Sequence, residues 1–89
     1  MINDIFLERY PKIDLHGCDR DTARMLVNDF INDNVILGNE TVLIIHGIGT
    51  GILRREVQDA LSVNKHVLEY KIDNFNSGCT IAKLKISLK

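Results

Sequence analysis

The chain has no tryptophan, a single proline and only two cysteines among its 89 residues. Cys18 and Cys79 lie far apart and form no Cys-x-x-Cys pair, so we expect two reduced thiols and neither a disulfide framework nor a zinc ribbon. No apolar run approaches the roughly 20 residues that a membrane helix needs. The start of the sequence also lacks the basic region and long apolar stretch of a signal peptide. These absences predict a cytoplasmic protein without a membrane partner.

A surplus of charge of one sign is also missing, because 11 Lys and Arg against 12 Asp and Glu give a formal net charge of −1. No overall basic field attracts nucleic acid, so a polyanion has to find a local patch. The basic residues gather in three places: Arg54 and Arg55 open a predicted helix, Lys71 lies on one late segment, and Lys83 and Lys85 lie on another. Taken singly, each is most simply a solvated surface charge.

What remains is the composition of an ordinary globular domain, with 45% hydrophobic and 26% charged residues. The length leaves room for a single domain, residues 1–89, whose residues 1–11 we expect to form an N-terminal extension packing on or near it. No linker, low-complexity tract or internal repeat divides the chain.

Hydrophobic periodicity predicts the element order βαβαββ. Asp19 or Asp21 is placed to cap a first helix that ends near Leu37 at Gly38, and a second helix begins after Gly51. The expected strands cover residues 13–16, 41–46, 66–73 and 80–88. Right-handed crossovers place both helices on one face of the sheet. The predicted fold is therefore an α/β protein, an α+β two-layer sandwich with one bare sheet face.

The most informative residues are two histidines at the ends of the first two strands. Alternation in the first strand puts Asp14 and His16 on the face away from the helices. In the second strand it groups Val42, Ile44 and His46, and we expect His46 to share the bare face or its rim with Asp14 and His16. Ligands bind beyond the carboxyl ends of parallel strands, so these side chains are functional candidates. The alternative is that each is a hydrogen-bonded turn residue.

A glycine-rich stretch follows the second strand, where Gly47, Gly49 and Gly51 surround the turn into the second helix. Glycine lets backbone N–H groups converge on an anion, and the helix N-terminus adds unpaired N–H groups and a positive dipole end. The spacing G-x-G-x-G matches neither G-x-G-x-x-G nor the Walker pattern, so we predict no nucleotide cofactor. The alternative is a tight turn without a ligand.

Two motifs in this order resemble the Smr (small MutS-related) domain family. Asp14-Leu15-His16-Gly17 is followed about 30 residues later by His46-Gly47-Ile48-Gly49-Thr50-Gly51-Ile52-Leu53-Arg54, and the likeness extends from about Ile13 to Leu84. The resemblance implies a four-stranded mixed sheet with two helices on one face, similar to the C-terminal domain of translation initiation factor three. It also implies a nucleic-acid endonuclease or binding domain that acts on RNA or DNA.

The resemblance assigns the candidate site residues. The catalytic candidates are Asp14, His16 and His46, and the candidates for binding phosphate are Gly47, Gly49, Thr50, Gly51 and Arg54. The local basic patch on the last strand adds Lys83 and Lys85 as candidates for binding nucleic acid, independently of the resemblance. Two histidines can act as proton acceptor and proton donor in phosphodiester cleavage, while a carboxylate fixes a ring tautomer. With RNA, the 2′-hydroxyl serves as internal nucleophile and no metal is required. With DNA, a divalent metal held by Asp14 and a histidine is the alternative way to activate water.

The resemblance therefore predicts cleavage or nicking of phosphodiester bonds, with RNA slightly favoured, in nucleic-acid repair or ribosome-associated RNA quality control. The alternatives are a non-catalytic module that docks on structured nucleic acid or the ribosome, and a small-anion binder. One stretch departs from the family pattern, which has Gly-Gly-x-Gly, a small residue and Thr before the last strand. Here Phe75-Asn76-Ser77-Gly78-Cys79-Thr80 keeps only the last Gly, the small residue and Thr. Asn76 and Ser77 are the side-chain donors available to replace the missing glycines.

Overall fold

The structure, a computed structural model, describes residues 9–73 and 76–86. Its elements are β1 (Lys12–Asp14), α2 (Arg20–Leu37), β2 (Thr41–Ile45), α3 (Ile52–Val63), β3 (Val67–Ile72) and β4 (Cys79–Leu84). This order confirms the predicted βαβαββ arrangement. The predicted contact of the N-terminal extension falls mostly on residues 1–8, and the predicted end of the last strand on residues 87–89, both of which lie outside the described residues.

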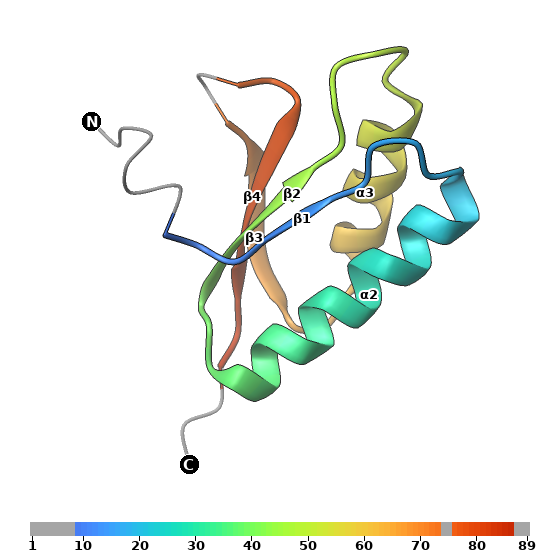
Figure 1. The fold of residues 1–89 in the computed structure, drawn as a ribbon. Coiled ribbons are helices and arrows are strands. Elements are labelled where there is room, and N and C mark those ends of the chain that lie inside the picture. The colour runs from blue at the N-terminus through green and yellow to red at the C-terminus, as the bar shows by residue number, and fades with distance from the viewer. Residues whose placement is uncertain (1–8, 74–75, 87–89) are drawn as a thin grey trace.

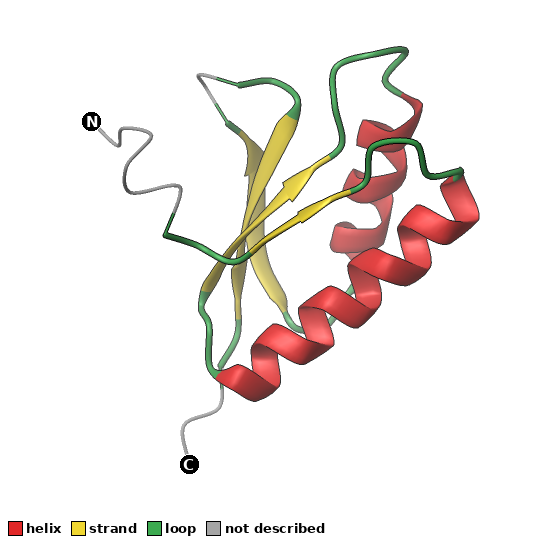
Figure 2. Cartoon of the chain, viewed as in Figure 1, coloured by secondary structure: helices red, strands yellow, loops and turns green. Residues whose placement is uncertain are grey.

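The four strands form one mixed sheet in the order β1-β2-β4-β3. β1 and β2 run parallel, whereas β4 is antiparallel to both β2 and β3. Both helices cover the same face of this sheet, as predicted (Figures 1 and 2). Within the described residues, no helix is long and apolar enough to cross a membrane.

The helix boundaries follow from local hydrogen bonds. Asp19 caps α2, its carboxylate accepting the Thr22 N–H at 2.7 Å, and this bond lowers the pKa of the Asp19 carboxyl. Gly38 ends the helix in the left-handed conformation, with φ of 82°. α3 differs, because its N-cap is Gly51 and its first turn has no acidic residue. The start of α2 is therefore closed by its own carboxylate, and the start of α3 is not.

The core fills the space between the sheet and the two helices. The largest fully buried side chains come from both layers: Leu15, Val27, Ile31, Val42, Ile44, Val57, Leu61 and Thr80. Arg24 on α2 and Glu56 on α3 form an ion pair of 2.7 Å across the helix layer. The pair links the two helices near their starts.

Candidate functional site

The loops after β1 and β2 meet at one end of the sheet, because parallel neighbours bring their carboxyl ends together (Figure 1). A surface hollow of about 440 Å³ lies between them. Cys18 and Asp19 of the β1–α2 loop and Arg20 at the start of α2 contribute to its lining, and the segment from His46 to Arg54 contributes the rest. The predicted glycine turn and the residues just after the first motif therefore share one concave site.

The two histidines end adjacent strands, as expected, but they face opposite sides of the sheet. Ile13 pairs with Ile44 and Asp14 with Ile45, so the register continues with Leu15 beside His46. Leu15 is fully buried beneath the helices and His46 is 5% exposed, whereas His16 is exposed. Residues paired across parallel strands share a face. The expectation that His46 shares the bare face with Asp14 and His16 is therefore wrong.

Asp14 stabilises the turn that follows its own strand. Its Oδ1 accepts the backbone N–H of His16 at 2.9 Å, and the next turn closes with a bond from Cys18 N–H to the Leu15 carbonyl at 3.0 Å. This is the alternative that the sequence left open for Asp14. The carboxylate holds the backbone of His16 in place. In this structure Asp14 therefore contacts the main chain of His16 and orients that residue.

His46 is held by hydrogen bonds on both ring nitrogens. Nδ1 lies 3.0 Å from the carbonyl oxygen of Gly47, and Nε2 lies 2.8 Å from the hydroxyl of Thr80 on β4. The Gln58 amide on α3 donates to the same hydroxyl at 3.0 Å. Burial is the main cause that lowers the pKa of His46, and the positive charge of Arg54 lowers it further, against the effect of the Gly47 bond. Burial and the nearby guanidinium therefore both favour the neutral ring.

The glycine turn is anchored to the loop before β4. The Gly78 carbonyl accepts the N–H groups of both His46 and Gly47, each at 2.9 Å. Gly47 and Gly51 have φ of 80° and 85°, values that favour glycine. A Cβ at Gly78 would lie 3.2 Å from the Gly47 backbone, which explains why this glycine remains in an otherwise altered stretch. Asn76 accepts the Gly78 N–H at 2.9 Å through its Oδ1, and donation to a ligand by its Nδ2 group stays a prediction.

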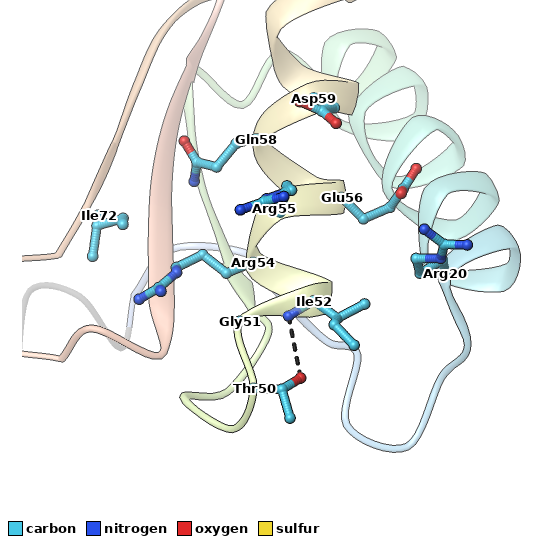
Figure 3. Close-up of a pocket in the computed structure, with 10 residues that line it drawn as sticks. All are labelled: Arg20, Thr50, Gly51, Ile52, Arg54, Arg55, Glu56, Gln58, Asp59 and Ile72. Atoms are coloured by element: carbon cyan, nitrogen blue, oxygen red, sulfur yellow. Dashed lines mark hydrogen bonds between the residues drawn. The ribbon is translucent and has the colours of Figure 1, made fainter.

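Arginines surround the open start of α3. Arg54 folds back toward the turn, since a Cβ built on Gly51 would lie 3.2 Å from its guanidinium. A second hollow of about 590 Å³ adjoins the first (Figure 3). Its charged lining residues are Arg20, Arg54 and Arg55 and the two carboxylates Glu56 and Asp59, of which Glu56 is paired with Arg24. The Ile52 amide meets the Thr50 hydroxyl at a long 3.4 Å. Cationic side chains and helix N–H groups together suit a phosphate.

Lys83 and Lys85, also expected to bind nucleic acid, lie away from this turn. Lys83 pairs with Thr41 at the beginning of β2, whereas the glycine turn follows the end of that strand. Four residues of strand separate the two ends by about 14 Å. Lys83 instead lines a separate hollow on the bare face with Tyr10 and Lys71. The structure brings together Gly47, Gly49, Thr50, Gly51 and Arg54, and it leaves both lysines outside that group.

Sequence reasoning missed Gln58 and Arg20. Gln58 reaches the site from the second turn of α3, and nothing in the sequence connects it with Thr80. Arg20 had one available signal, its place at the start of the first helix beside the motif.

Cys18 and Cys79 are both free, and burial raises the pKa of the Cys79 thiol. No group of three potential metal ligands occurs within residues 9–73 and 76–86.

Comparison with known proteins agrees with these motifs. The sequence profile of the Smr domain matches residues 13–85. Proteins named endonuclease MutS2 are similar over this region: the one from Clostridioides difficile is 39% identical over 77 residues, which is 83% of this chain and 10% of that protein. The one from Halothermothrix orenii is 38% identical over 78 residues, which is 84% of this chain and 10% of that protein. The chain thus spans about a tenth of the length of these relatives.

Two solved structures share the fold. The crystal structure of the Smr domain of Thermus thermophilus MutS2 superposes with a TM-score of 0.82 at 28% identity, covering 84% of this chain and 98% of that one. YdaL from Escherichia coli, a stand-alone small MutS-related protein, gives a TM-score of 0.81 at 27% identity, covering 86% of this chain and 68% of that one.

Proposed function

Because this chain belongs to the Smr domain family, a family of nucleic-acid-binding and nuclease domains, we propose that it binds nucleic acid at the glycine turn and cleaves phosphodiester bonds there, with RNA favoured over DNA. The observation that carries the proposal is the hollow between the glycine turn and the residues that follow the first motif, with Arg54 folded over the start of α3. His16 does not line this hollow and lies two residues before Cys18, which does. Backbone N–H groups of the turn and the Arg54 guanidinium hold a phosphate and stabilise its developing charge.

His16 is the proton acceptor in this proposal. It is exposed at the end of β1, and the Asp14 carboxylate fixes its backbone. On RNA, His16 accepts the proton of the 2′-hydroxyl as that oxygen bonds to phosphorus, and the 5′-oxygen leaves with a proton from solvent. Lys83 and Lys85 guide a longer polymer at a distance from the cleaved bond. On DNA, activation of water by a divalent metal is the alternative, and adding a chelator to the cleavage assay tests it.

The experiment measures cleavage of labelled single-stranded RNA and of supercoiled plasmid by wild type and His16→Ala, with and without a chelator. We expect the wild type to cleave RNA in the presence of chelator. We expect His16→Ala to lower the rate by about 100-fold or more, with little change in affinity. Full activity in His16→Ala refutes the assignment of His16.

A non-catalytic module that binds nucleic acid or the ribosome is the second candidate. The observation in its favour is that both ring nitrogens of His46 are already hydrogen-bonded within the protein, so two free histidines do not face each other. Binding without cleavage of either polymer by the wild type supports this candidate. Saturable binding of a mononucleotide to the wild type, with no competition by RNA or DNA polymer, supports a small-anion binder instead.

A further inference from the structure

We propose that Gln58 and Thr80 are positioning residues that hold His46 as a neutral ring protonated on Nδ1, and that His46 sets the glycine turn without transferring a proton. The effect on cleavage rests on the proposed function. The protonation state of the ring does not, because it is measurable without substrate. Gln58 then positions His46 through Thr80, and His46 orients the glycine turn, whereas His16 accepts the proton.

The hydrogen-bond partners determine which ring nitrogen carries the proton. A backbone carbonyl only accepts, so the 3.0 Å contact with the Gly47 oxygen requires a proton on His46 Nδ1. Gln58 donates to the Thr80 hydroxyl oxygen at 3.0 Å, which leaves the single hydroxyl proton to point at His46 Nε2, 2.8 Å away. The chain therefore runs in one direction, from Gln58 through Thr80 and His46 to Gly47.

Burial makes this direction consequential. Thr80 is fully buried and His46 is 5% exposed, so water does not readily replace a lost partner. Among the described residues that are not exposed, every buried side-chain nitrogen and oxygen has a hydrogen-bond partner. Burial and Arg54 also disfavour a second proton by lowering the pKa of His46. A complete, directional network of buried groups selects one tautomer.

The network holds Gly47, the first residue of the glycine turn, by both its backbone N–H and its carbonyl. The Gly47 carbonyl accepts from His46 Nδ1, and the Gly47 N–H donates to the Gly78 carbonyl at 2.9 Å. With Thr80 on β4 and Gln58 on α3, the ring joins the end of β2 to both neighbouring elements. The orientation of the following N–H groups depends on this anchor, and misplacement by about 1 Å is enough to cost 100-fold in rate.

The test is nitrogen-15 NMR of the histidine rings in the full chain. For the wild type we expect His46 protonated on Nδ1 only, with Nε2 unprotonated, at pH 7. A ring protonated on Nε2 at that pH overturns the proposal. Gln58→Glu is the decisive variant, because an ionised carboxylate accepts and reverses the Thr80 hydroxyl. His46 Nε2 must then donate, and we expect the ring to carry a second proton at pH 7.

Ser62→Ala is the matched control, since Ser62 lies one turn further along α3, is exposed and bonds only the Asp59 carbonyl in the described hydrogen bonds. Its His46 signals should equal those of the wild type. If the His46 ring in folded Gln58→Glu has the same protonation state as in the wild type, the proposed hydrogen-bond chain is refuted. Where the wild type cleaves RNA, Gln58→Glu should lower the rate about tenfold or more. A wild type without cleavage refutes the proposed function and leaves the NMR result to decide this inference.

Discussion

Replacing Gly78 by alanine tests whether the loop before β4 sets the glycine turn. The new Cβ would lie 3.2 Å from both the Gly47 Cα and carbonyl carbon and 3.2 Å from Asn76 Oδ1. The Asn76 oxygen already accepts the Gly78 N–H, so it cannot turn away without losing that bond. The Gly47 backbone must therefore move by a few tenths of an ångström.

The expected stability change has two opposing parts. Overpacking against backbone costs about 1 to 3 kcal/mol. The φ of Gly78 is not positive, so alanine also restricts the unfolded chain and returns about 0.4 to 1 kcal/mol. A net loss of about 1 to 2 kcal/mol corresponds to a fall of about 5 to 15 °C in the midpoint of thermal unfolding for a domain of this size.

The assay combines thermal unfolding with affinity for labelled RNA and with the amide chemical shift of Gly47. Gly38→Ala is the matched control, because Gly38 has φ of 82° and open space around it at the end of α2. It should lose stability without changing RNA affinity, whereas Gly78→Ala should change both and shift the Gly47 amide. An unchanged Gly47 shift and unchanged affinity in a folded Gly78→Ala protein would refute the reasoning.

Four further outcomes follow from the site. Thr80→Val should cost about 1 to 3 kcal/mol in urea unfolding by leaving His46 Nε2 without its donor. Thr80→Ser keeps the hydroxyl and loses one buried methyl group, so it should cost about 0.5 to 1.5 kcal/mol and leave the His46 ring signals unchanged. The pKa of His46 is lowered in the folded protein, so its neutral ring contributes fully to the free energy of unfolding above about pH 6.5 and less as the pH falls below that value. In unfolding measured against pH, His46→Gln should not show this decline in stability. Arg54→Ala should reduce the salt slope of RNA binding by about one unit, and Lys83→Ala by less. Gly49→Val, at φ of 26° with no atom near its Cβ, should fold and bind RNA more weakly in a titration.

The sequence predicts the elements well because their signals are local. Asp19 marks the start of α2 by accepting a hydrogen bond from the Thr22 N–H. Gly38 and Gly51 mark helix boundaries because each has a positive φ that favours glycine. The first strand alternates clearly, so the buried position of Leu15 and the exposed position of His16 follow from the pattern. Motif order then indicates the family and the turn.

The side on which His46 lies depends on pairing between distant segments. Val42, Leu43 and Ile44 are all buried, so alternation in β2 does not distinguish its two faces. Only the pairing of Ile13 with Ile44 places His46 under the helices. The contact between Gln58 and Thr80 joins α3 to β4 across 22 residues and depends on the same packing. The position of Lys83 likewise follows from the antiparallel pairing of β4 with β2.

The strand order has a consequence for self-association. β1 and β3 form the two edges of the described sheet, and an exposed edge is a template for pairing with another chain. β1 has three residues and is preceded by Pro11, which has no N–H to donate, while β3 has an irregular register between Val67 and Glu69 and carries the exposed charge of Lys71. Short length, proline, a bulge and charge all oppose strand addition. Extension of the described sheet by backbone hydrogen bonds from a second chain at β1 or β3 is therefore disfavoured.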